Sequence, residues 1–122
     1  MPYNPDAPPS AADWLSRDEG ARVDQVLDYH RNHKITVANE RLHAAIHVVV
    51  ETQVAAGEPV VVETMARLER EGLSRHEAMH AVGSVLADRI VAALRAKTPK
   101  PALADGYLED LKALSAAGWK AT

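Results

Sequence analysis

Apolar residues recur at every third or fourth position along most of the chain, the repeat of helices that bury one face. Such segments span about 16–33, 39–57, 60–71, 74–97 and 105–116. No segment alternates apolar and polar residues as a half-buried strand does. The pattern therefore predicts an all-α fold, an irregular four- to five-helix bundle with up-down connectivity.

The predicted helices are bordered by residues that commonly cap or end helices. Two Ser-x-x-Glu strings have the spacing of capping boxes, an Asn is a suitable N-cap, and glycines stand where helices end. They are Ser16 with Glu19, Ser74 with Glu77, Asn39, Gly57 and Gly72. The connectors between the segments are short, so we expect consecutive helices to be antiparallel neighbours.

Each predicted helix has an expected buried stripe. The stripes are Val23, Val26, Leu27 and His30; Leu42, Ile46, Val49 and Val50; Val61, Met65 and Leu68; Met79, Val82, Gly83, Leu86, Ile90 and Leu94; and Leu108, Leu111 and Leu114. The small residues Gly83 and Ala87 would let a neighbouring helix approach closely. Because the chain has no Phe, the predicted core is mainly aliphatic.

The chain is predicted to form one domain with an extension at its start. Residues 1–9 contain four prolines and are expected to form an extended Pro-rich arm, whereas residues 10–122 form a single helical domain. The formal net charge is −3 with acids and bases intermixed, which argues against nucleic acid and anionic membranes as partners. There is no cysteine, no secretion signal and no apolar run of membrane-spanning length, so we expect a cytoplasmic protein.

All six histidines are expected at the same end of the bundle. With antiparallel helices, the end of the first helix and the starts of the second and fourth meet there. These segments carry His30 and His33, His43 and His47, and His76 and His80, respectively. Within each of the last two pairs the spacing is four residues, so both side chains lie on one helix face.

Two facing histidine pairs would suit a metal ion. Four imidazoles satisfy the tetrahedral preference of zinc, and imidazole also binds iron, nickel and copper. The candidate ligands are His43, His47, His76 and His80, with Glu51 and Glu77 as supporting acids, and zinc or iron is the expected ion.

Other interpretations of the same residues stay open. Residues 76–80 form an HExxH string, the zinc-binding motif of metal-dependent hydrolases, but Glu77 is also the capping-box residue of its helix. The histidines would alternatively be packed, hydrogen-bonded groups in a structural or protein-interaction module, for instance a homodimer. The sequence does not establish enzymatic activity and favours its absence.

Two stretches resemble a known family. Residues 41–53 (RLHAAIHVVVETQ) and 71–87 (EGLSRHEAMHAVGSVLA) are similar to the domain of unknown function 1841 family of small, bacterial, all-helical proteins. The likeness extends over about residues 16–95, and the paired histidine strings are its most distinctive part. It implies an all-helical fold and assigns neither an activity nor catalytic residues.

Overall fold

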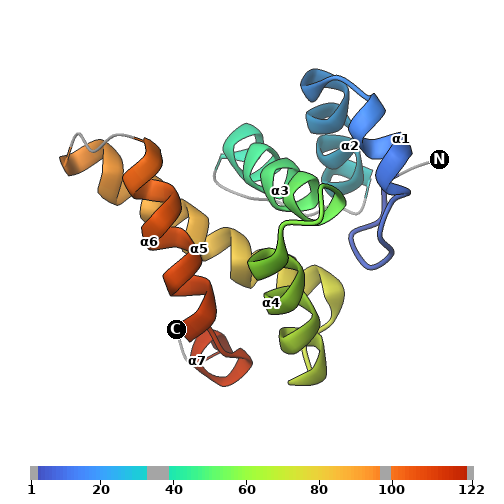
Figure 1. Cartoon of the computed structure of the whole chain (residues 1–122). Helices are drawn as coiled ribbons and strands as arrows, with labels where there is room; N and C mark the ends of the chain where they lie inside the picture. Colours follow the sequence, from blue (N-terminus) through green and yellow to red (C-terminus); the bar gives the residue numbers. More distant parts are fainter. Residues whose placement is uncertain (1–2, 33–38, 97–99, 121–122) are drawn as a thin grey trace.

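The protein is built from helices (Figure 1). The computed structural model describes residues 3–32, 39–96 and 100–120, and these contain no strand. The helices are α1 (Ala11–Ser16), α2 (Glu19–Asn32), α3 (Glu40–Ala55), α4 (Pro59–Arg70), α5 (Arg75–Ala96), α6 (Lys100–Ala113) and α7 (Ala116–Lys120). The predicted all-α class is confirmed, and two short helices, α1 and α7, accompany the five longer ones.

Most of the predicted helix ends are confirmed. The Asn39 side chain accepts a hydrogen bond from the Leu42 N–H and caps α3. At the start of α5, Ser74 and Glu77 bond each other's backbone N–H groups at 3.1 and 2.9 Å, a complete capping box. Gly57 and Gly72 follow the ends of α3 and α4 with φ of 77° and 105°, a conformation that glycine adopts without a steric penalty.

The predicted capping box at Ser16 is wrong. Ser16 is the last residue of α1, and its hydroxyl donates to the Asp13 carbonyl. Asp18 caps α2 instead, since its carboxylate accepts the Ala21 N–H at 2.8 Å. An aspartate is as good an N-cap as a serine, so Asp18 caps α2 in the role predicted for Ser16.

The last predicted helix begins earlier than expected and is followed by another. Its predicted start was Asp105, but α6 already begins at Lys100, because Pro101 lies in the first turn, where a helix needs no backbone N–H donor. Of the break expected between the last two predicted helices, at Thr98-Pro99-Lys100-Pro101, Thr98 and Pro99 lie outside the described residues, and the part at Lys100 and Pro101 is wrong because both belong to α6. After α6, the Ser115 hydroxyl accepts the Gly118 N–H in the first turn of α7.

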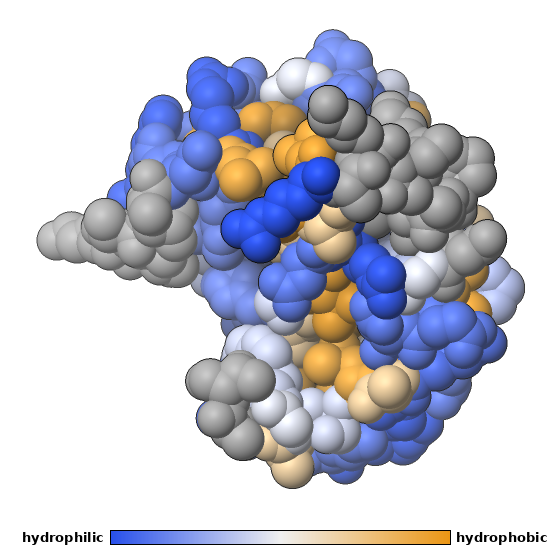
Figure 2. Space-filling view, turned by 90° about the vertical axis from the view of Figure 1, so that its left-hand side faces the viewer, coloured by the Kyte–Doolittle hydropathy of each residue, from blue (hydrophilic) through white to orange (hydrophobic). Residues whose placement is uncertain are grey.

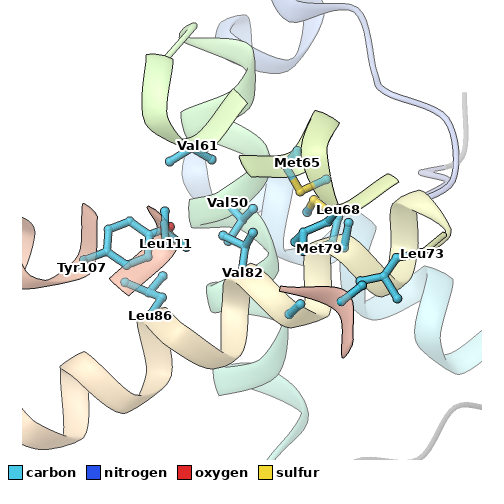
Figure 3. Packing of buried hydrophobic residues seen from close by; sticks show 13 residues of the cluster. Val50, Val61, Met65, Leu68, Leu73, Met79, Val82, Leu86, Tyr107 and Leu111 are labelled. Atoms are coloured by element: carbon cyan, nitrogen blue, oxygen red, sulfur yellow. The ribbon is translucent and has the colours of Figure 1, made fainter. Parts of the chain in front are cut away.

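Two apolar clusters lie on opposite sides of α3, and α3 contributes residues to both. The first joins α3 to α4, α5, α6 and α7, and includes Val50, Leu68 and Val82 (Figure 3). The second joins the arm, α1, α2 and α3 through Tyr3, Trp14, Val26, Leu27, Ala44 and Val48. Helix α3 therefore packs between two groups of helices.

Three residues that were predicted to be in the core are exposed instead. Leu42 and Val49 are 51% and 37% exposed, because α3 turns Ala44 and Val48 toward α2 and Val50 toward α4 and α5. Leu94, in the last turns of α5, is 74% exposed. Figure 1 shows this end of α5 extending with α6 away from α3 and α4. The hydrophobic period identified the helices correctly but not the width of each buried face.

The chain turns sharply between α3 and α4, by 103°. None of the individual helices in the described ranges is long and apolar enough to cross a bilayer, although α3 and α4 together meet the length and composition criteria across this bend. In the face shown in Figure 2, apolar residues lie in a hollow and hydrophilic residues surround it.

Candidate metal centre

Five histidines gather where α2, α3 and α5 meet. His30 comes from the last turn of α2, His43 and His47 from the first turns of α3, and His76 and His80 from the first turns of α5. The ring centroids of His30 and His43 lie 4.8 Å apart, those of His43 and His80 5.0 Å, and those of His76 and His80 4.3 Å. The prediction that these five meet is confirmed, and His33 lies outside the described residues.

Four of the five histidines are close enough to share one ion. His30, His47, His76 and His80 each offer a ring nitrogen, and the four nitrogens lie within 4.8 Å of one another. Ligands of a tetrahedral zinc ion lie about 3.4 Å apart, so shifts of about 1 Å would bring the set to that spacing. Three helices supply the four side chains, so their approach depends on tertiary packing.

The predicted residues divide into three groups. His47, His76 and His80 belong to the four-histidine set, and His43 borders it. The fourth member is His30, which was not among the predicted ligands. Glu51 and Glu77 contribute no ligand atom to the set. The exposed Glu77 carboxylate instead caps α5, so the HExxH string here lacks a glutamate turned toward its histidines.

The tautomer of His30 follows from its backbone contact. Its Nδ1 lies 2.8 Å from the Val26 carbonyl oxygen, and a carbonyl oxygen only accepts, so Nδ1 carries the proton and donates. When His30 binds a metal ion as neutral imidazole, Nε2 is therefore the nitrogen that has the lone pair. Because His30 is 3% exposed, water does not readily reach this lone pair. The lone pair is therefore available to a metal ion.

A chain of three side chains fixes the tautomer of His47 in the same way. The Tyr3 hydroxyl donates to a Glu51 carboxylate oxygen at 2.6 Å, so its oxygen is free to accept from His47 Nδ1–H at 3.1 Å. Glu51 is in turn held by Arg75, whose Nη1 lies 3.1 Å from the same carboxylate oxygen. His47 Nε2 therefore carries a lone pair, as does His30 Nε2. Metal-bound histidines commonly donate their second ring N–H to such a partner.

Four buried ring nitrogens find no hydrogen-bond partner among the residues that the structure describes. They are the Nε2 atoms of His30, His43, His47 and His80. A buried polar atom without a partner costs about 1–3 kcal/mol, so such a cluster is expensive unless something binds it. A cation placed among these atoms would satisfy several at once.

Burial and the neighbouring histidines favour the neutral form of His47 and His80. Burial is the larger cause, and together the two effects lower the pKa of His47 to about 2 and that of His80 to about 4. The pKa of His43 is lowered for the same reasons. Neutral imidazole is the form that binds metal ions, so at neutral pH His43, His47 and His80 are already in the binding state.

The N-terminal arm closes this region. Besides the Tyr3 contacts, the Pro5 carbonyl accepts from Arg75 at 2.9 Å, and the Asp6 carboxylate accepts the His76 N–H at 3.0 Å. Burial and the neighbouring Glu51 raise the pKa of Tyr3 far above its usual value, so the phenol stays protonated.

Sequence reasoning did not assign Tyr3 or Arg75 to the site. The position of Arg75 directly before His76 is the local feature that could have indicated it. Glu51 was predicted from its four-residue spacing from His47. Nothing local indicates that Tyr3, at the start of a Pro-rich segment, reaches these residues.

The fold and this site define the chain as a small all-α protein with a buried histidine cluster at a junction of three helices. It belongs to the family described as domain of unknown function (DUF1841), whose model matches residues 18–113. The matched range contains α2 to α6 and all five clustered histidines, whereas Tyr3 lies outside it. No curated protein and no solved structure gives a significant match to the chain.

Proposed function

We propose that this protein binds one divalent transition-metal ion, zinc or iron, through His30, His47, His76 and His80. The observation that carries this proposal is the approach of four ring nitrogens from three helices to within 4.8 Å of one another. Zinc and ferrous iron both accept neutral imidazole ligands, and a set without thiolates or carboxylates does not select the hard ions magnesium and calcium.

The supporting contacts have the form of an outer ligand shell. The Val26 carbonyl orients His30, and Tyr3, held by Glu51, orients His47. Both contacts direct a lone pair of Nε2 toward the cluster. In a packed histidine core without an ion, there would be no reason for His30 and His47 to have the same tautomer. The two Nε2 lone pairs would also be left unsatisfied beside each other.

The test is metal analysis of protein purified without an affinity nickel column. We expect about one zinc or iron ion per chain, lost in the double variant His47→Ala/His80→Ala. Glu77→Gln serves as the control, because the Glu77 carboxylate is outside the four-nitrogen set and should leave the metal content unchanged.

The same ion should stabilise the fold. A free ion concentration one hundred times Kd adds about 2.7 kcal/mol to the free energy of unfolding, which corresponds to about 10 °C in Tm for a domain of this size. Chelator should reverse the increase. A protein that is isolated without metal, takes up no zinc or ferrous iron, and has the same Tm with and without chelator would contradict the proposal.

A further inference from the structure

A small cleft opens beside the histidine cluster, between α3 and α5. It has a volume of about 280 Å³, and His43, His47 and His80 are among the residues that line it. Two of these histidines belong to the four-nitrogen set, so the cleft borders the place where the ion would sit.

The remainder of the cleft is apolar. Ile46 from α3 and Met79 and Ala87 from α5 line it, and none of the described lining residues carries a formal charge at neutral pH. Its hydroxyl, Ser84 Oγ, donates to the Ala81 carbonyl. A ligand in this cleft would therefore find apolar surface along its body and imidazoles at one end.

The charge around the cluster decides which kind of ligand is favoured. All four proposed ligands are histidines, and imidazole binds a metal ion in its neutral form, so a divalent ion would keep both of its positive charges. The nearest buried acid, Glu51, is already paired with Arg75 and gives no net compensation. A buried charge without compensation is costly, so an anionic donor on the ion would relieve it.

We infer that the cleft binds a small organic monoanion, with its anionic end as a fifth donor to the metal ion beside the four imidazoles and its apolar body between α3 and α5. This inference rests on the metal site proposed above. It goes further in naming the class of ligand and the side from which the ligand reaches the ion. A carboxylate on a ring or a short branched chain fits both the charge and the size of the cleft.

The small residues of α5 leave the space for this ligand. A Cβ atom added to Gly83 would lie 3.0 Å from Ile46 Cγ2, so the two helices are in contact there. One turn further along α5, the half-buried Ala87 lines the cleft, and a larger side chain at this position would fill it without changing any histidine.

The experiment uses the full chain loaded with Co²⁺, whose visible absorption spectrum reports its ligands. Co²⁺ uptake is measured first, and then benzoate, acetate and benzamide are titrated separately. We expect benzoate to change the spectrum with an affinity about tenfold higher than acetate, which lacks the apolar body, and than benzamide, which lacks the charge.

Two matched variants locate the ligand. Ala87→Leu should weaken benzoate binding about tenfold and leave Co²⁺ uptake and acetate binding unchanged. Ala92→Leu makes the same substitution at an exposed position of α5 outside the cleft and should behave as the wild type.

The outcomes separate the two proposals. Failure to take up Co²⁺ would contradict the metal site itself. Normal uptake with no spectral response to benzoate, with equal affinities for benzoate and acetate, or with unchanged benzoate binding in a folded Ala87→Leu protein would overturn the cleft ligand alone. The comparison of benzoate with acetate in the wild type decides the matter even if Ala87→Leu fails to fold.

Discussion

His47 and Tyr3 are 44 residues apart in the chain, and their hydrogen bond decides which nitrogen of His47 faces the cluster. The phenol donates to Glu51 and so presents its oxygen to His47 Nδ1–H. His30 reaches the same tautomer through a backbone carbonyl. At the scale of the residue, the proposed metal site is thus positioned by groups that are not among its four proposed ligands.

Tyr3→Phe tests this preparation. The variant keeps the ring in its apolar cluster and removes the acceptor for His47, so we expect metal affinity to fall by about 10–100-fold. Affinity would be measured by competition with a chelator of known Kd.

Tyr107→Phe is the matched control. Its hydroxyl is bonded to Gln53, and Tyr107 lies in the other apolar cluster, so its loss should lower stability by about 1 kcal/mol without changing metal affinity. Equal affinities in the wild type and in Tyr3→Phe would show that Tyr3 has no part in positioning His47.

At the scale of the helix, α3 and α5 are joined by a buried ion pair next to the histidines. The side chains of Glu51 and Arg75 are 1% and 8% exposed, and the arm adds the Tyr3 and Pro5 contacts to the same pair. Such a pair sets the relative position of two helices more than it adds net stability, because both charges lose their hydration.

Glu51→Ala should therefore be severe. It leaves the Arg75 guanidinium buried without its carboxylate, and we expect the free energy of unfolding to fall by about 3–5 kcal/mol. The measurement is urea denaturation in the presence of chelator, so that metal binding does not contribute.

Glu40→Ala gives the comparison. The ion pair of Glu40 with Arg31 joins side chains that are 44% and 56% exposed, and its loss should have no measurable effect. If Glu51→Ala were as mild as Glu40→Ala, the buried pair would not hold α3 against α5.

At the scale of the whole molecule, the cluster lies at the junction of two groups of helices. The arm, α1 and α2 pack on one side of α3, and α4 to α7 pack on the other. The proposed ligands come from α2, α3 and α5, so a bound ion would link both groups.

The stability of the metal-free protein should depend on pH in a defined window. His47 and His80 have their pKa lowered in the folded state, to about 2 and about 4, whereas histidines of the unfolded chain titrate near 6.5. The unfolded chain therefore binds more protons below pH 6.5, so the free energy of unfolding falls as the pH is lowered from 6.5 toward 4. Above pH 6.5 these two groups contribute no further change.

Urea midpoints at several pH values, with chelator present, measure this dependence. The double variant His47→Leu/His80→Leu lacks both groups and should have a flatter profile between pH 6.5 and 4.5. Parallel profiles for the two proteins would show that the buried histidines are not what makes the fold acid-sensitive.

Local sequence patterns were sufficient to predict the helices and the two histidine pairs of the candidate site. The apolar repeat, the Asn39 cap, the Ser74–Glu77 box and the two glycines fixed the main helix ends, because each depends on residues a few positions apart. The four-residue spacing placed His43 with His47 and His76 with His80 on shared faces for the same reason. Short connectors then brought these pairs to one end of the bundle.

Only the tertiary structure decided the rest. It brought His30 to the histidine cluster, joined Tyr3, Glu51 and Arg75 by a chain of hydrogen bonds, and left Leu42, Val49 and Leu94 exposed. The physical reason is distance along the chain. Contacts between residues tens of positions apart depend on how the helices cross, and sequence periodicity gives the face of a helix but not the neighbour that covers it.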